Sequence, residues 1–506
     1  HDWVLSNTTV QSAGNVTLKG IGFSNSTLNI TGALNLSSDK WLTLDGNTIN
    51  ASQGVVLNGT QGVTLRDYAG GNTTTLTATT PDLLVVYDGA QEEPSLADAV
   101  LNISGNTTML SSGDLTLSNV ALKGADSGRL MVSADGTFTV QQGTNLSAGD
   151  ISISGNSLFL NGSAPADATE ASGSVLNATT GNLNLTVNGS GNVNNGGGNI
   201  TLQAAKDVNL TVNTSFSGKA ITLDGMDITA GNDLVLNAAT SGTAGNNFNV
   251  ISMSGGNLTA TAGNLSITAS GAHSDGTNAV VSLGGGATLS AGKAMTLTGT
   301  NQWVGTGVRL NNVSLNAASL SLCGSTVAGG TGFSLTNITL SEALKDLTNV
   351  TFSSAGSSAN TTNLLDNSVV SAVITGNTLD TFLSRGADNL TQIEMNGTAV
   401  FSNTSSGWTE DYSNASKPDG GWLLNNTSVT AGGDVNLTGV GFGNSTLSLT
   451  SGNLTLSNTG DLQLSDSNVT LANGSMNLST TQGDLSLSGT TVTQAGEGSH
   501  TTLNSA

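Results

Sequence analysis

The sequence predicts an all-β fold, a right-handed parallel β-helix (β-solenoid) that forms an elongated rod. Three observations favour it. Short stretches of alternating apolar and small polar residues recur from end to end. Turn residues separate these stretches at intervals of about seven to nine residues. The chain also holds 67 glycines and only 4 prolines, so it can form many sharp corners and long uninterrupted strand ladders.

The individual strands are predicted from phrases such as "NVTLKG" at 15–20, "ALNLSS" at 33–38 and "GNLTLS" at 452–457. Alternation with a period of two residues places one side chain inside and the next outside. Two or three such strands make a coil of about 20 residues, which is the repeat length of solenoids. At about 4.8 Å per coil, the chain would make roughly 25 coils and a rod on the order of 120 Å long.

The composition fits this fold. Leu, Val and Ile are expected to point inward and stack on the next coil, whereas Gly and Asn take the corners that need a positive φ. Thr, Ser and Asn are expected to face outward as hydrogen-bonding ladders. Only 9% of the residues are charged, as expected where identical side chains stack at short distance and like charges would repel.

A long internal repeat predicts the domain organisation. Residues 3–28 align without a gap with residues 422–447, and both copies contain the phrase "NSTL". We therefore expect residues 1–421 to be one β-helical module and residues 422–506 to be the start of the next tandem module, continuous with the same rod. The chain begins in mid-pattern at His1, which indicates a piece of a longer protein.

Two segments depart from the alternating pattern and are predicted to be irregular loops. Residues 81–100 gather acidic side chains and prolines, and residues 404–421 gather aromatic and charged ones. Loops on a rigid scaffold often carry recognition, which makes Trp408, Tyr412 and Trp422 the candidate binding residues. The alternative is that these segments only relieve the geometry of the coil.

The charge balance excludes several classes of partner. The chain has 12 Lys and Arg against 34 Asp and Glu, a formal net charge of −22. The few Lys and Arg residues form no basic patch that could replace the counterions of a nucleic acid. No nucleic-acid partner is therefore expected. No apolar run of about 18 residues occurs, so this fragment is not expected to insert into a membrane.

Motifs for catalysis, cofactors and metals are not found, and the chain is predicted not to be an enzyme. The three histidines stand in no recognisable motif, and calcium-binding nonapeptides would need aspartates that the glycine-rich phrases lack. Asp67 beside Arg66 is the nearest approach to a catalytic pair and is interpreted as a surface ion pair. Cys323 is the only cysteine, and we predict a buried, inert thiol.

The motif that exceeds background is the N-x-[ST] sequon, an acceptor site for asparagine-linked sugars. Two interpretations stay open: real glycosylation, or asparagines that only form corners and ladders. Many of the sequons stand in strand-like phrases, where asparagine is normally depleted. The candidate glycosylation sites are Asn7, Asn15, Asn25, Asn29, Asn35, Asn426, Asn436, Asn444 and Asn453.

The phrases "GNLTL", "GDLSL" and "AGGDVNLTG" resemble the repeats of filamentous-haemagglutinin-type exoproteins of bacterial two-partner secretion. The dense sequons resemble the asparagine-glycosylated high-molecular-weight adhesins of that group, and passengers of autotransporter adhesins are the near alternative. The resemblance implies a secreted protein of the bacterial cell surface, exported with an outer-membrane partner.

The predicted function is therefore that of an extracellular adhesin rod that attaches to host surfaces, or promotes cell-cell aggregation and biofilm formation. Its partner would be a host receptor or glycan, or another copy of itself. Three alternatives remain: the passive stalk of a contact-dependent inhibition or other surface effector protein, a β-helical polysaccharide-degrading enzyme, and an ice-binding surface suggested by "TTTLTATT" at 73–80.

Overall fold

The computed structural model describes most of the chain. The described residues are 3–66, 74–78, 83–87, 96–162, 173–196, 198–215, 218–241, 248–271, 278–303, 305–326, 331–345, 349–356, 361–366, 373–374, 390–395, 399–403, 408–411, 422–425 and 427–505. The chain divides into two compact units: unit 1 comprises His1–Ser241 and Ser252–Gly263, and unit 2 comprises Gly242–Ile251 and Asn264–Ala506.

Unit 1 is built from short β-strands. They are β1 (Trp3–Ser6), β2 (Thr9–Ser12), β3 (Val16–Lys19), β4 (Ile21–Ser24), β5 (Thr27–Ile30), β6 (Leu34–Ser38), β7 (Trp41–Asp45), β8 (Thr48–Ala51), β9 (Val55–Gly59), β10 (Gly62–Arg66), β11 (Thr74–Ala78), β12 (Leu83–Tyr87), β13 (Leu96–Ile103), β14 (Thr107–Ser111), β15 (Leu115–Gly124), β16 (Arg129–Ala134), β17 (Thr137–Val140), β18 (Asn145–Ala148), β19 (Asp150–Gly155), β20 (Ser157–Leu160), β21 (Ser174–Ala178), β22 (Leu183–Gly189), β23 (Val193–Asn194), β24 (Ile200–Ala204), β25 (Val208–Thr214), β26 (Ile221–Thr222), β27 (Asp227–Ala230), β28 (Leu234–Thr240) and β30 (Asn257–Ala260). β29 (Ile251–Ser254) has residues in both units.

Unit 2 is also built from strands, with one short helix among its described residues. Its elements are β31 (Leu265–Gly271), β32 (Ala279–Ala291), β33 (Ala294–Asn301), β34 (Thr306–Asn316), β35 (Ser319–Thr326), β36 (Thr331–Leu340), α1 (Glu342–Lys345), β37 (Val350–Gly356), β38 (Thr361–Asp366), β39 (Val373–Ile374), β40 (Leu390–Met395), β41 (Ala399–Asn403), β42 (Trp408–Asp411), β43 (Trp422–Asn425), β44 (Thr427–Ala431), β45 (Val435–Thr438), β46 (Val440–Gly443), β47 (Thr446–Leu449), β48 (Leu454–Asn458), β49 (Leu462–Ser465), β50 (Asn468–Leu471), β51 (Met476–Thr480), β52 (Leu485–Ser488), β53 (Thr491–Gln494) and β54 (Thr501–Asn504).

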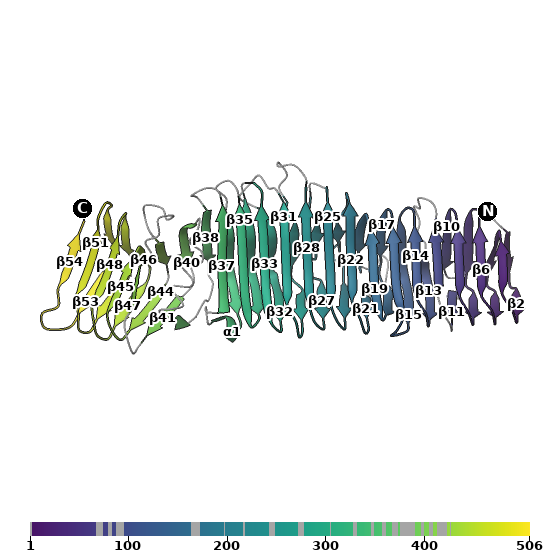
Figure 1. Cartoon of the computed structure of the whole chain (residues 1–506), viewed down its shortest axis with the longest axis horizontal. Helices are drawn as coiled ribbons and strands as arrows, with labels where there is room; N and C mark the ends of the chain where they lie inside the picture. The colour runs from purple at the N-terminus through teal and green to yellow at the C-terminus, as the bar shows by residue number, and fades with distance from the viewer. Residues whose placement is uncertain are drawn as a thin grey trace. The chain divides into compact units, whose positions relative to one another are not determined.

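The chain is therefore all-β, and the strand pairs described here are parallel. Early in unit 1 each strand pairs with the strand three elements later: β1 with β4, β2 with β5, and β3 with β6. The chain thus returns to the same sheet after 18 residues between Thr9 and Thr27, and after 21 between Thr27 and Thr48. In Figure 1 strands such as β22, β25 and β28 lie side by side in this order.

Identical side chains stack in the core because each strand keeps the register of the one before it. Leu185, Leu210 and Leu236 are direct partners on β22, β25 and β28, and each is fully buried. The residues between them alternate outward, as the period-two pattern predicted. Burying one leucine contributes roughly 2 kcal/mol, so these rows are a major source of stability.

Strands occur in the two segments predicted to be irregular loops, and strand pairs cross the predicted module boundary. β12 lies within 81–100, β13 begins within it at Leu96, and β42 lies within 404–421. The rest of those two ranges is outside the described residues. Within unit 2, β41 pairs with β44 and β42 with β45, so strand pairing joins residues on both sides of position 421. Two strand ladders thus cross the start of the sequence repeat, whereas the sheet β43-β46-β49-β52 begins there.

Candidate binding surface and asparagine sites

Asn7, Asn25 and Asn444 lie at corners, which are the bends between strands where one residue has a positive φ. Their φ values are 51°, 45° and 45°. Asparagine tolerates this left-handed conformation better than other residues that carry a Cβ. The side chain of Asn25 also donates a hydrogen bond from Nδ2 to Oδ1 of Asn7, at 2.6 Å. Corner geometry by itself therefore accounts for the asparagine in these three sequons.

The second residue of each corner sequon is a small hydroxyl residue that forms hydrogen bonds within the fold. Ser26 and Ser445 are 4% and 3% exposed, and each Oγ donates to a carbonyl oxygen two residues earlier, at 2.8 and 2.7 Å. The backbone N–H of Thr8 donates to Oγ of Ser26 at 3.0 Å. The third residue, such as Thr27, then begins an outward-facing strand position. The phrase N-S-T is thus explained residue by residue.

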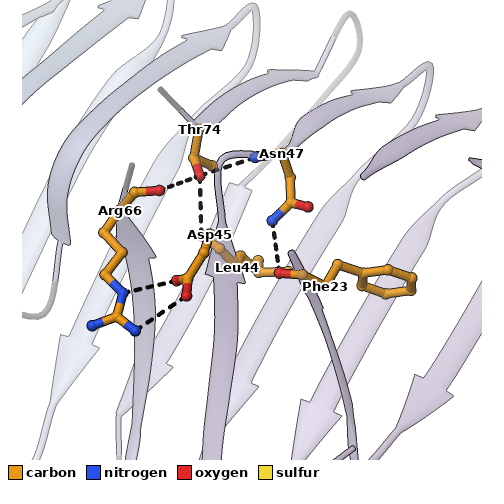
Figure 2. Close-up of polar contacts among 6 residues, drawn as sticks. All are labelled: Phe23, Leu44, Asp45, Asn47, Arg66 and Thr74. Carbon is orange, nitrogen blue, oxygen red and sulfur yellow. Dashed lines mark hydrogen bonds and ion pairs between the residues drawn. The ribbon is translucent and has the colours of Figure 1, made fainter. Parts of the chain in front are cut away.

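Asn47 stands before β8 in the place that Ser26 has before β5, and it connects three consecutive corners (Figure 2). Its side chain is fully buried. Nδ2 donates to the carbonyl oxygen of Phe23 at 2.9 Å, and Oδ1 accepts from the backbone N–H of Ser26 at 3.0 Å. Its backbone N–H donates to Oγ1 of Thr74 at 3.2 Å. The buried amide is therefore satisfied by fixed backbone groups, which ties the register of neighbouring strands together.

The outer side of this corner carries the best-formed ion pair of unit 1 (Figure 2). Arg66 donates to both carboxylate oxygens of Asp45, from Nε at 3.0 Å and from Nη2 at 3.1 Å. Oγ1 of Thr74 lies 2.6 Å from the carbonyl oxygen of Arg66. The ion pair predicted for Arg66 thus involves Asp45 on the neighbouring strand, and Asp67 is outside the described residues. Such a bidentate pair orients the two side chains.

Asn15 and Asn453 stand immediately before a strand and accept a backbone hydrogen bond through their side-chain oxygen. Nδ2 of Asn453 also donates to Oδ1 of Asp434, at 3.4 Å. Oδ1 of Asn15 accepts from the backbone N–H of Ala33 at 2.9 Å, and Oδ1 of Asn453 accepts from that of Ser475 at 2.8 Å. Asp434, which matches Asn15 in the repeat, does the same for Asn453 at 2.7 Å. This position needs an acceptor and no amide nitrogen. Both asparagines are exposed, so sugar on Nδ2 is compatible with the bond to Oδ1.

The remaining sequon asparagines that the structure describes point outward from strands. Asn35 is exposed on β6 and has no hydrogen bond to another described residue. Asn29 on β5 is half-buried and accepts from Nδ2 of Asn50 at 2.9 Å, while Asn436 on β45 is half-buried. Asn426 lies outside the described residues. Among the candidate glycosylation sites that the structure describes, Asn35 is the one whose side chain makes no hydrogen bond to another described residue.

The outward side of four neighbouring strands forms a regular, uncharged surface that we call the polar face. Each strand contributes two residues, and direct partners lie on adjacent strands of β2, β5, β8 and β11. All eight are exposed or half-buried. The polar face consists of Thr9, Gln11, Thr27, Asn29, Thr48, Asn50, Thr75 and Thr77. Outward ladders of Thr, Ser and Asn were predicted in general, and the recurrent phrases "TVQ", "TLN", "TIN" and "TLT" mark this particular row.

Unit 2 carries a second surface of the same kind on β47, β50 and β53. Thr446, Asn468 and Thr491 are direct partners, as are Ser448, Thr470 and Thr493. All six are exposed except Ser448, which is half-buried. β47 is the counterpart of β5 in the internal repeat, and β50 and β53 follow β47 in the sheet as β8 and β11 follow β5. The outward residues of these strands are polar and uncharged in both places.

The structure describes two of the three candidate binding residues of the second loop, and both lie on strands. Trp408 lies on β42 opposite Val435, and Trp422 lies on β43 opposite Val440, so both belong to strands of the ladder. Tyr412 lies outside the described residues. Trp408 and Trp422 therefore lie on strands, and their role in binding stays a prediction.

The prediction of a buried Cys323 was wrong. The thiol is half-buried, and Cys323 lies on β35 opposite Thr298 of β33, which is also half-buried. Leu320 and Leu322 point into the core, so strict alternation places the next residue outside. The prediction relied on the general tendency of cysteine to be buried. The alternation of inward and outward residues along the strand is what determines the direction of this side chain.

Titratable clusters that could carry chemistry are not found in the part of the chain that the structure describes. No group of three or more His, Cys, Asp or Glu side chains is arranged there to hold a metal ion. His500 is exposed, with Nδ1 3.1 Å from Oγ of Ser475; His1 and His273 fall outside the described residues. None of the described helices has the length and hydropathy needed to cross a membrane.

No protein-family model, no curated protein and no solved structure matches this chain.

Proposed function

We propose that the parallel strands form a right-handed β-helix, and that this chain is the rod of a secreted bacterial adhesin related to the filamentous-haemagglutinin type. The return of the chain to the same sheet every 18 to 21 residues supports the helical winding. In a secreted rod with an outer-membrane export partner, length and surface chemistry carry the function.

The observation that carries the adhesive role is the polar face and its second copy on β47, β50 and β53. Hydroxyl and amide groups repeat in register at about 4.8 Å, the spacing of neighbouring strands. Each hydrogen bond to a partner is worth about 1 kcal/mol, so recognition depends on many such groups acting together. A repetitive uncharged surface of this kind suits attachment to a glycan, a host receptor or another rod.

The proposal includes glycosylation of exposed sequons, with Asn15, Asn35 and Asn453 as the best acceptors. The amide nitrogens of Asn15 and Asn35 make no hydrogen bond to another described residue, and that of Asn453 makes only a long one, 3.4 Å to Oδ1 of Asp434. In contrast, Nδ2 of Asn25 bonds to Asn7 at 2.6 Å. Asn15→Asp is a suitable variant because Asp434 already fills the matching position. Peptide mapping of protein from its native host should show hexose on these residues, and the variant should lose it at position 15 alone. Unmodified peptides at all three sites would remove glycosylation from the proposal.

Adhesion itself is tested with beads coated with the whole chain. We expect the beads to attach to epithelial cells or to one another, whereas beads coated with the same chain after irreversible unfolding should do neither. If coated and control beads behave alike, the adhesin proposal fails.

A second candidate function is that of a passive stalk. The parallel pairs β41 with β44 and β42 with β45 favour it, because these two pairs join strands of one sequence module to strands of the next. A stalk predicts that the coated beads bind nothing, so the bead experiment also decides between these two functions.

A further inference from the structure

We propose that the polar face is a contact surface for a second copy of this chain. The inference rests on the proposed adhesive function and deepens it, because it assigns aggregation to eight residues on β2, β5, β8 and β11. The reasons are the hydrogen-bonding state of these residues, their spacing, their charge and their recurrence in unit 2.

The hydroxyl groups of the polar face are available for an external partner. Those of Thr9, Thr27, Thr48 and Thr75 make no hydrogen bond to another described residue, whereas buried Thr74 beside them lies within hydrogen-bonding distance of backbone oxygens of Leu44 and Arg66. The amides of Asn29 and Asn50 bond to each other through one donor and one acceptor, which leaves further donors and acceptors exposed.

The spacing of the polar face selects another stack of parallel strands as its partner. Its rows repeat once per strand, at about 4.8 Å. A ladder of hydrogen bonds across many rows stays in register only if the partner repeats at the same distance. A second copy of the chain has the same distance between its strands, and its own polar face offers the same donors and acceptors.

Charge also favours the polar face as the place where copies meet. Two chains of formal net charge −22 repel each other, so close contact is least costly where the surface carries no carboxylate. All eight residues of the polar face are uncharged. The surface on β47, β50 and β53 is also uncharged, and a second contact of this kind would raise the effective affinity without a new type of interaction.

The test places charge on the polar face while sparing the fold. In the double variant T9E/T48E the new carboxylates stand on β2 and β8, with β5 between them, so they are not direct partners in the sheet. The matched control T186E/N237E adds the same charge on β22 and β28, with β25 between them. Sedimentation velocity of the whole chain, at concentrations up to about 100 µM, measures self-association of the three proteins.

The unmodified chain should self-associate, and more strongly as NaCl is raised, because salt screens the repulsion between negatively charged copies. T9E/T48E should weaken the association at least tenfold, and T186E/N237E should leave it unchanged. Equal weakening by the two double variants, or an unmodified chain that stays monomeric at high salt, would overturn the assignment. In that last case the bead experiment decides separately whether the adhesin proposal survives through a host partner.

Discussion

The two copies of the internal repeat show which features the fold demands and which it leaves free. At the corner, Asn25 and Asn444 have the same φ of 45°, and each is followed by a buried serine. One strand further on the copies differ: Asn47 bonds to the carbonyl oxygen of Phe23, whereas Oγ of Ser467 bonds to that of Ser465. Backbone conformation and small buried volume are kept, while the identity of the buried polar group changes with its partner.

The outward sides of the two copies teach a different lesson. Thr27 and Asn29 correspond to Thr446 and Ser448, and none of these four side chains is needed to fill the core. All remain polar and uncharged. A surface that folding leaves free but that keeps its chemistry in both copies is a reasonable place to look for recognition.

Core leucines should show the largest effects on stability in both copies. Leu36 and Leu456 are fully buried, and each stacks between two leucines, Leu18 and Leu57 for the first and Leu437 and Leu478 for the second. Changing either to alanine should cost about 2 to 5 kcal/mol, because a cavity is left. Hydrogen exchange should show the loss only in strands next to the mutated one, since each of these strands pairs with the strands before and after it in its sheet. Unfolding of the whole chain in one step would contradict this.

Asn47→Ala should separate the copies most clearly. Removing the amide leaves the N–H of Ser26 and the carbonyl oxygen of Phe23 without their partner, at a cost of about 3 kcal/mol. Ser467→Ala in the other copy removes the partner of the Ser445 N–H and of the Ser465 carbonyl oxygen, but it takes away fewer atoms and leaves less empty space. It should cost about 2 kcal/mol. Urea unfolding, monitored by hydrogen exchange of the backbone amides in β5 and β47, measures the loss of stability in the two variants. Equal losses would mean that the buried amide of Asn47 stabilises its copy no more than the hydroxyl of Ser467 does.

The matched glycines Gly22 and Gly441 should respond alike. A Cβ on Gly22 would lie 2.5 Å from the backbone oxygen of Thr43, and one on Gly441 would collide in the same way with that of Gln463. Each alanine variant should cost about 1 to 3 kcal/mol, because strands must move apart. Thermal unfolding followed by circular dichroism is the measurement, and a neutral Gly22→Ala would show that the strands can separate freely.

Asn25→Gly and Asn444→Gly should have the smallest effects. Glycine adopts the positive φ of the corner without strain, so stability should stay within about 0.5 kcal/mol. Asn25→Ala is the matched control and should cost about 1 kcal/mol, since alanine is strained in this conformation. Both changes abolish the sequon, so a glycine variant that loses adhesion but keeps its stability would assign a role to sugar at that corner.

Local sequence pattern was enough to predict much of the fold. Alternation determined the strands, and stacking of like residues predicted parallel pairing, as the row of Leu185, Leu210 and Leu236 confirms. The short helix at Glu342–Lys345 lies within "SEALKDLTNV", where at most a turn or two was predicted. These features follow from a periodicity that each residue shares with its chain neighbours.

Only the tertiary structure decided what each polar residue does. Asn7 at a corner, Asn15 before a strand and Asn35 on a strand share the same sequon, and they differ in the residues that approach them from the neighbouring strands, 18 to 21 positions away. The same holds for Asn47, whose bonds to Phe23 and Ser26 cross from one strand to the next. A sequence determines its periodicity locally, whereas the partners of a buried amide depend on the register in which distant segments meet.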